Sequence, residues 1–344
     1  MGNDLNQKLV VGLDAGGTRT RAVLAAAEDG RPLGEGAAGP GNAMTVPVPR
    51  LTDHLAEALA RAVPQEARGR VVAVAGGFAG ATAASPDDPG HVNARSALTE
   101  ALRRLGIPAG PIGISSDIEA AFASAPGTPA GGLALVAGTG AVAMRITDRR
   151  GTATVDGDGW LLGDDGSGFW IGRAAVRAGL RMADGRGPAT ALAGSVGQAL
   201  GLPGEVLPGG PVLSYEEGGA VVADWPRARR EAYRMHLLPA VMAEPPIRLA
   251  RLAPLVAEAA GEKDAVAVAI LDEAADQLTD AVGALAPRPG EPLVATGGLL
   301  GPDGPLTSRL TVRLAPLGLT LDWVPDGCRG AVALARLAHR GGSR

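Results

Sequence analysis

The sequence has almost no cysteine and almost no lysine. Of its 344 residues only Cys328 is a cysteine, so one chain can form neither an internal disulfide nor a cysteine-rich zinc or iron–sulfur site. This usage fits a cytoplasmic setting. We interpret Cys328 as a small buried residue rather than a nucleophile. Arginine replaces lysine nearly everywhere, which indicates codon bias and carries no mechanism.

Long apolar runs and basic clusters are also missing. The first apolar stretch follows the polar residues 1–8 and is far shorter than the ~18 residues that a membrane helix needs. The net charge is −4 and the basic residues are scattered, so no basic face favours nucleic acid or an anionic membrane. With 46% hydrophobic residues, the chain can bury a large core in about two domains. We therefore expect small-molecule partners, with no nucleic acid and no membrane.

Glycine, by contrast, is abundant, and it gathers in turns between strands. The segment "LVVGLDAGGTRTRAVLA" (9–25) has an apolar run, then glycines, then a period-two alternation typical of strand, turn and strand. No helical spacing follows the turn and no Gly-Lys-Ser/Thr occurs, which disfavours the Walker loop and the dinucleotide-binding fingerprint. A second such hairpin occupies 132–147, and a further glycine turn ends a strand within 292–300. Two like hairpins, each heading about half of the chain, suggest a duplicated α/β unit.

Helical patterns fill the intervals between these strands. The apolar spacing predicts helices over 51–63, 94–105 behind an Asn93 cap, 166–185 behind a Ser167 cap, 227–242, 248–260, 265–285 and 327–340. Further strands are predicted near 70–78 and 111–116, and proline and glycine predict a surface loop over 202–219. This alternation predicts an α/β protein in two lobes, with ligand sites at strand ends.

The glycine turns suggest a phosphate clamp. Glycine lets backbone N–H groups approach an anion, because no Cβ intervenes. Two turns facing each other could grip a polyphosphate, with Gly16, Gly17 and Thr18 on one side, Gly138, Thr139 and Gly140 on the other, and a third turn at Gly297 and Gly298. Asp14 would reach toward Mg²⁺ through water, since that ion prefers oxygen ligands and keeps much of its hydration. The alternative is a set of ordinary hairpin turns.

Asp117 stands where a strand becomes a helix. A carboxylate there accepts hydrogen bonds from the first amides and meets the positive end of the helix dipole, which favours its ionised form. This suits a base that takes a proton from a hydroxyl attacking phosphorus, although a helix cap without chemistry is an equal alternative. We expect Glu119, two residues on, to be a solvated charge of the first turn.

The segment "DGDGWLLGDDGSGFWIG" (156–172) is the densest in functional residue types. It holds four aspartates, two tryptophans and six glycines ahead of a predicted helix. Carboxylates accept hydrogen bonds from sugar hydroxyls and aromatic faces stack on C–H surfaces, so the segment suits a polyhydroxylated ligand. Calcium is the alternative, but the acidic spacing does not match the helix-loop-helix pattern.

Together these elements resemble the N-acetylglucosamine kinase branch of the BadF/BadG/BcrA/BcrD ATPase family, within the actin, hexokinase and Hsp70 superfamily. The resemblance rests on the Asp-x-Gly-Gly-Thr turn, the Gly-Thr-Gly turn, Ser-Asp-x-x-Ala-Ala, "LLGDDGSGFWIGRAA" and the late Thr-Gly-Gly. It implies a duplicated ribonuclease-H-like (actin-like ATPase) fold with two lobes around a central cleft. The first lobe would comprise 1–125 joined by the C-terminal helix 330–344, and the second 126–329 with a helical insertion. It also implies a homodimer.

The resemblance further implies an ATP-dependent kinase for the 6-hydroxyl of N-acetylglucosamine or glucosamine, assisted by Mg²⁺. Thr18 and Thr139 would contact the ATP phosphates, and Gly297 and Gly298 would lie against the adenosine. Asp117 would be the general base. The sugar would contact Asp117 together with Asn42, Gly157, Asp158, Gly159, Trp160 and Asp164.

Asp158 departs from the pattern of this family, whose members usually have tryptophan there. A carboxylate in the sugar pocket favours an ammonium over an acetamide, so we hypothesise that glucosamine rivals N-acetylglucosamine as substrate. The alternative is that Asp158 points to solvent.

Three alternative functions share this fold. The family also contains ATP-driven activators of dehydratases and reductases, which need at least two cysteine ligands per chain, and this chain has one. The repressor-related sugar kinases carry a cysteine-histidine zinc motif that is absent here. A nucleotide-gated sugar sensor without turnover is a further alternative, although Asp117 and both phosphate turns are intact.

Overall fold

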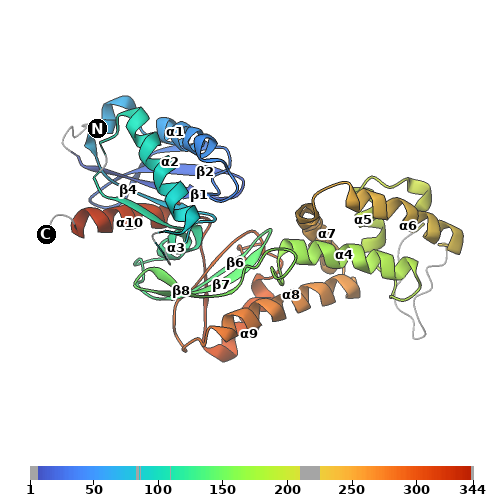
Figure 1. Ribbon diagram of the computed structural model, residues 1–344. Helices are drawn as coiled ribbons and strands as arrows, with labels where there is room; N and C mark the ends of the chain where they lie inside the picture. The colour runs from blue at the N-terminus through green and yellow to red at the C-terminus, as the bar shows by residue number, and fades with distance from the viewer. Residues whose placement is uncertain (1–6, 83–84, 86, 109, 210–224, 342–344) are drawn as a thin grey trace.

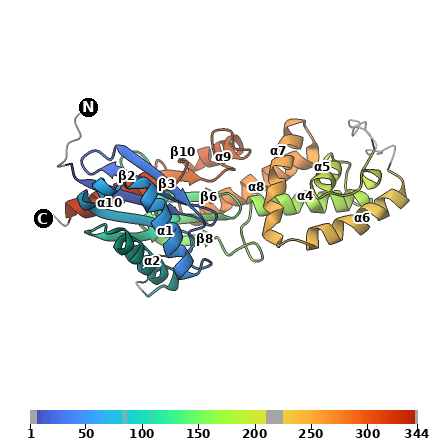
Figure 2. The same cartoon turned by 90° about the horizontal axis from the view of Figure 1, so that it is seen from above.

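The computed structural model describes residues 7–341 except 83–84, 86, 109 and 210–224. It contains two five-stranded mixed sheets with helices packed on them. Figures 1 and 2 show an elongated molecule, with the first sheet and α1, α2 and α10 at one end and a helical region, α4 to α7, at the other. No helix of the described residues is long and apolar enough to cross a membrane.

The two sheets share one topology. The first runs β3(Pro32–Ala38), β2(Thr20–Ala26), β1(Leu9–Ala15), β4(Val71–Phe78), β5(Ile112–Ser116). The second runs β8(Arg150–Asp156), β7(Ala141–Thr147), β6(Gly132–Ala137), β9(Leu293–Thr296), β10(Leu321–Trp323). In each, the first three strands pair antiparallel and the last two join in parallel. This repetition confirms the expected duplicated α/β fold.

The first sheet is covered on both faces. The helices α1(Val48–Ala62) and α2(Pro89–Leu105) bury their apolar residues with Val11 and Leu13 on one face. The last helix, α10(Cys328–Gly341), packs on β1 and β4 on the other face, beside α3(Asp117–Ala123). Gly12 of β1 allows this contact, because a Cβ there would overlap the backbone of Val332. The end of the chain is therefore part of the core built by its beginning.

The second half carries the helical region. Its helices are α4(Gly168–Ala183), α5(Leu192–Ala199), α6(Arg227–Met242), α7(Ala253–Gly261), α8(Ala265–Ala284) and α9(Thr307–Leu314). Short 3₁₀ turns lie at η1(Gln65–Arg70), η2(Gly204–Val206), η3(Pro246–Leu252) and η4(Ala315–Leu317). The largest hydrophobic cluster runs from the second sheet into these helices, where Tyr233 is fully buried.

Several boundaries differ from the sequence prediction. Helix α2 begins at Pro89 and is capped by Asp88, which accepts a hydrogen bond from His91 N, so the Asn93 cap was wrong. Asn93 instead donates to Ala43 O at 3.0 Å. The helix expected over 248–260 is divided between η3 and α7. Of the predicted loop 202–219, residues 204–206 form η2, and 210–219 lie outside the described residues.

Candidate active site

Asp14 and Asp117 lie at one edge of the first sheet. Parallel strands β1, β4 and β5 all end there, with Asp14 opposite Gly77 and Ser116 opposite Phe78. Gly77 allows α3 to pack closely on β4, because a Cβ there would overlap Ala120 Cβ and press on Ser116 O and Asp117 Cα. Burial, then the charge of Asp326, then that of Asp117 raise the pKa of Asp14 to about 6. The two predicted site residues are therefore neighbours in space.

Asp117 is the first residue of α3 rather than its cap. Ser116 is the N-cap: its hydroxyl accepts from Glu119 N at 3.1 Å, and Glu119 Oε2 accepts from Ser116 N at 2.8 Å. Glu119 is 2% exposed, so the expectation of a solvated charge was wrong. Its Oε1 also accepts from Gly151 N of the second sheet at 2.8 Å. The Ser-x-x-Glu spacing at 116–119 is typical of a capping box, and it could have predicted that the Glu119 side chain folds back onto the start of the helix.

The charge state of Asp117 is set by burial. Burial raises the pKa of Asp117, and the hydrogen bond from Ile118 N to Oδ1, at 3.0 Å, only partly opposes this. From its position at the start of a helix, the Asp117 carboxylate was expected to be held in its ionised form, but desolvation by burial outweighs the effect of the helix terminus on its pKa. A carboxylate with a raised pKa is a stronger base, which suits a group that accepts a proton from an attacking hydroxyl.

The first glycine turn is braced by the loop that carries Asn42. Gly16 N donates to Arg19 O and Gly41 N donates to Gly16 O, both at 2.9 Å. Asn42 Oδ1 accepts from Met44 N and Thr45 N at 2.9 and 3.0 Å. Gly17 and Thr18 remain exposed at the tip of this turn. The turn is thus held from behind, and its tip is free to meet a ligand.

The residues around Asp14 fit a hydrated magnesium ion. Ligand atoms of Asp14, Asp326 and Cys328 lie within 4.8 Å of one another. Burial raises the pKa of the Cys328 thiol, so it stays protonated and is a poor ligand for a hard cation. Arg21 Nη1 lies 2.7 Å from Asp326 Oδ2 and 3.8 Å from Asp14 Oδ2, so it mainly balances Asp326. Asp14 is the carboxylate left for a cation.

The second glycine turn is anchored to the start of α4. Gly168 N donates to Gly138 O at 2.8 Å and Phe169 N donates to Thr139 O at 3.1 Å. Ser167 caps the helix through Trp170 N, as the sequence predicted. These bonds use the carbonyl groups of the turn and fix its backbone against a helix.

The third turn joins the second at a cavity. Gly297 has φ +108° and packs so closely on the end of β6 that a Cβ would overlap Ala137 O. A cavity of about 520 Å³ lies beside these turns and is lined by Gly138, Thr139 and Gly298. Its other walls are the small apolar residues Gly168, Ala250, Ala253, Pro254, Ala257, Leu299 and Pro305. An apolar slot beside two backbone turns has the character expected of a site for a planar base attached to phosphates.

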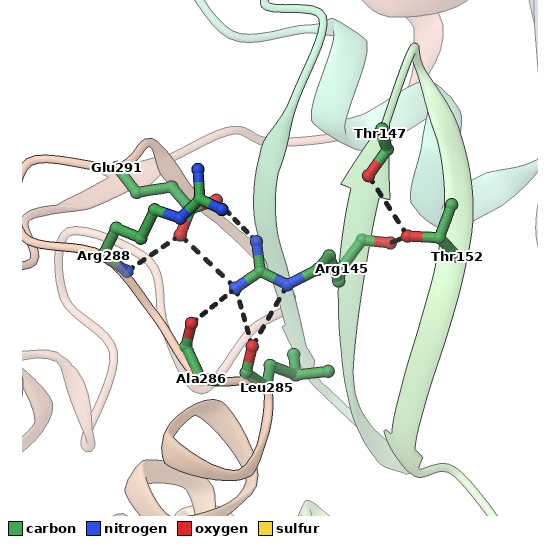
Figure 3. Close-up of polar contacts among 7 residues, drawn as sticks. All are labelled: Arg145, Thr147, Thr152, Leu285, Ala286, Arg288 and Glu291. Carbon is green, nitrogen blue, oxygen red and sulfur yellow. Dashed lines mark hydrogen bonds and ion pairs between the residues drawn. The ribbon is translucent and has the colours of Figure 1, made fainter.

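Figure 3 shows Arg145 of β7 in contact with Leu285, Ala286 and Glu291, which lie in the connection before β9. The Arg145 guanidinium donates to Leu285 O at 2.6 and 3.1 Å and pairs with Glu291 Oε1 at 2.7 Å. Burial raises the pKa of Glu291, but the hydrogen bonds from Arg145 and from the Arg288 backbone, together with the charges of both arginines, outweigh it, so the pKa is lowered. This clamp fixes the connection between α8 and β9, and β9 carries the third turn. The sequence analysis did not identify Arg145.

The loop from 156 to 165 is organised by Asp156. This residue has φ +62°, and its carboxylate accepts from Gly157 N, Asp164 N and Asp165 N at 2.6–2.7 Å. Asp164 is buried, and its Oδ1 accepts from Ala141 N at 3.1 Å. The role of Asp156 in shaping the loop was missed, because the sequence shows no partner for it.

The predicted sugar residues of this loop lie together. Burial, then the charges of Asp156 and Asp158, raise the pKa of Asp164, so Asp158 is electrostatically coupled to the buried carboxylate although its own side chain is exposed. Gly157 and Gly159 both have positive φ, and Trp160 packs edge-on against Phe169 with ring centroids 5.8 Å apart. The loop is strongly acidic at the point where the sugar was expected.

The structure thus gathers the predicted residues into two groups. Asp14, Asp117, the first turn and Asn42 belong to the first sheet. The second and third turns and residues 157–164 belong to the second. The contact between Glu119 and Gly151 joins the two halves close to Asp117.

The family model described as "BadF/BadG/BcrA/BcrD ATPase family" matches residues 11–307. This chain belongs to that family. Membership in an ATPase family implies the use of ATP.

Individual relatives agree with this assignment. A curated N-acetylmuramic acid/N-acetylglucosamine kinase of Clostridium acetobutylicum is 28% identical over 191 residues, which cover 55% of this chain and 59% of that protein. The match therefore spans little more than half of that relative.

Two crystal structures share the fold over almost the full length. They are proteins provisionally assigned as N-acetylglucosamine kinases, from Chromobacterium violaceum and Porphyromonas gingivalis. They are 22% and 21% identical to this chain with TM-scores of 0.66 and 0.68, and each match covers 96% of this chain and 99% of the other. At these identities the likeness shows the common fold.

Proposed function

We propose that this chain is an ATP-dependent amino-sugar kinase that transfers the γ-phosphoryl group to the 6-hydroxyl of N-acetylglucosamine or glucosamine. The observation that carries the proposal is the position of Asp117, a carboxylate with a raised pKa beside Asp14 at the edge of the first sheet. Family membership and the cavity lined by Gly138, Thr139 and Gly298 support ATP as the donor.

In this proposal the chain contributes positioning and one proton transfer. Backbone amides of the turns at 16–18 and 138–140 would hold the phosphates, except those of Gly16 and Gly138, which donate to Arg19 O and Gly140 O within the turns. Gly297 and Gly298 would border the adenosine. Asn42, Asp164 and the segment 157–160 would bind the sugar. Asp117 would accept the hydroxyl proton late, because phosphoryl transfer depends mainly on alignment and charge stabilisation.

Magnesium would be held by Asp14 through water. When bound, the ion neutralises negative charge on the phosphates during transfer. We also propose that the chain forms a homodimer, since many members of the family are dimers.

Release of ADP in the presence of different sugars tests the proposal. We expect ADP to be released faster with N-acetylglucosamine or glucosamine than with glucose, with N-acetylmannosamine or in a control without sugar. The variant Asp117→Asn should lose turnover by roughly 10²- to 10⁴-fold, the usual contribution of a general base, while it still binds the sugar. Turnover close to that of the wild type in this variant would refute the assignment.

The same assay separates the alternative function. A protein that binds both ATP and sugar but forms no ADP would be a sugar sensor. Binding of both ligands by calorimetry, run beside the turnover assay, makes the two outcomes distinguishable.

A further inference from the structure

A second, larger cavity borders the first glycine turn at Arg19 and the surroundings of Asp14 at Asp326 and Cys328. Its volume is about 1040 Å³, and it shares no lining residue with the cavity at Gly138 and Gly298. Its walls are β2 and β3 of the first sheet and, facing them, the first half of α10. Figure 2 shows α10 alongside β2. We call this cavity the hinge groove, because it is also bordered by residues 123–128, which lead into the second sheet, and by Pro325 and Asp326, which lead back.

The hinge groove is basic on a protein that is acidic overall. It is lined by six arginines: Arg19, Arg21, Arg31, Arg61, Arg329 and Arg336. Among the residues that the structure describes, three carboxylates line it, those of Asp29, Glu35 and Asp326. The chain as a whole has a net charge of −4, so this local excess of positive charge runs against its composition.

Several of these arginines have no strong counterion. Within the described residues, Arg19 and Arg329 are exposed and form no ion pair within 4.0 Å, and Arg31 has only Asp29, with Nε 3.9 Å from Oδ2. Arg336 donates to the carbonyl oxygens of Ala27 and Glu28, which orients its guanidinium and leaves its charge uncompensated. Guanidinium groups without carboxylate partners are well suited to bind phosphate, often through two parallel hydrogen bonds.

We propose that the hinge groove binds a phosphorylated small molecule, with Arg31 and Arg329 supplying phosphate contacts from opposite walls. The groove has the volume of a small-molecule site, and its charge selects an anion. Because both connections between the two halves of the chain line it, an occupant would touch the segments that must bend when the halves move. This position makes the hinge groove a candidate effector site. It does not depend on the kinase proposal, because binding requires no turnover.

Isothermal titration calorimetry on the full chain tests this site. The probes are inorganic phosphate and glucose 6-phosphate, with glucose as the uncharged control. We expect inorganic phosphate and glucose 6-phosphate to bind in the hinge groove. Glucose has no phosphate group, so we expect no glucose binding that depends on these arginines. The charge reversals Arg31→Glu and Arg329→Glu should each weaken phosphate binding at least tenfold, the effect of losing one charge-assisted contact.

A matched charge reversal on the opposite face of the same sheet is the control. Arg95 of α2 is exposed, and Arg95→Glu changes the net charge equally, so it should leave phosphate binding unchanged. Both test arginines are exposed, so the variants should unfold at the temperature of the wild type. Absence of phosphate binding would overturn the proposal. Binding that survives both Arg31→Glu and Arg329→Glu would overturn it too, because the anion would then lie elsewhere.

Discussion

Asp14 is an unfavourable residue for the fold at neutral pH, because its carboxylate is buried beside Asp326 and Asp117. Its pKa in the native state is about 6 against an ordinary 3.8, so the native protein holds the proton more tightly than the unfolded chain does. The free energy of unfolding therefore falls as the pH rises from about 4 through 6, and the loss is complete above that range.

The variant Asp14→Asn should remove this cost. With magnesium chelated, we expect the free energy of unfolding to rise by up to about 3 kcal/mol at pH 8 and by about half of that at pH 5. Urea unfolding at the two pH values measures the difference. If Asp14→Asn were less stable than the wild type at both pH values, the ionised Asp14 carboxylate would stabilise the fold, and its pKa would not be raised by burial.

Asp158 bears on the choice of sugar. Its charge already acts on the buried Asp164, so it should also act on an ammonium group bound in the same loop. In Asp158→Asn, we expect the ratio of kcat/KM for glucosamine over N-acetylglucosamine to fall about fivefold to tenfold, which corresponds to roughly 1 kcal/mol of interaction between charges. Steady-state kinetics with both sugars measures this.

The control for this prediction is Asp280→Asn, on the exposed surface of α8. It removes the same charge away from the loop and should leave the ratio unchanged. An unchanged ratio in Asp158→Asn as well would mean that the carboxylate points to solvent.

Single residues were predictable from the sequence where a local rule decides them. Ser167 caps α4 as expected, and Cys328 is buried as expected. Glu119 and Asp156 were misjudged or missed because their partners, Gly151 and Asp165 among them, become neighbours only through tertiary structure or a turn with positive φ. The roles assigned to Asp117 and the glycine turns stay predictions.

At the scale of elements, α4 packs closely on η3, and both contribute residues to the cavity of about 520 Å³ beside the second and third turns. Gly172 lies against η3, and a Cβ there would overlap Leu249 O, a backbone atom that cannot move alone. The variant Gly172→Ala should therefore push α4 from η3, lower the free energy of unfolding by about 1–3 kcal/mol and raise the KM for ATP. Thermal unfolding and ATP kinetics measure the two effects.

Gly283 of α8 provides the matched control. It is exposed and helical, and a Cβ would meet nothing within 4 Å. Gly283→Ala should stabilise the protein by up to about 1 kcal/mol, because alanine loses less backbone entropy in a helix. If both variants were equally tolerated, the close packing of α4 on η3 would not be needed for the cavity.

Helices and the two hairpins were predicted well, whereas three of the four edge strands in the described residues were not; the fourth, β5, was predicted. The predicted helix over 227–242 matches α6, and both glycine hairpins are present. Strands β3, β8 and β10 were not predicted, because an edge strand pairs on one side only and carries little of the apolar pattern that marks a buried strand. In β8 most side chains are exposed, which leaves no alternation to recognise.

At the scale of the whole molecule, the first half of the chain needs the last helix. On the face covered by α10, Val10, Ala73 and Ala75 are buried against Val332 and Ala335. The duplicated topology was predictable because two similar hairpins head the two halves. The contact of α10 with β1 was supplied by the resemblance alone, because no local pattern encodes a pairing across some 300 residues.

This dependence predicts how fragments behave. Residues 1–125 alone expose the apolar face under α10 and should aggregate or remain partly unfolded, since a lone sheet face cannot be left in water. The same fragment joined by a glycine-serine linker to residues 326–344 regains Val332 and Ala335 and should fold with a cooperative transition. Circular dichroism and thermal unfolding of the two fragments measure this.

Two variants of the joined fragment test whether α10 acts through its buried face. Val332→Asp should abolish the transition, because it would bury an unpaired charge, whereas Leu337→Asp, at a position 39% exposed, should be tolerated. A cooperative transition in residues 1–125 alone would contradict the proposed boundary and show that the first sheet folds without the end of the chain.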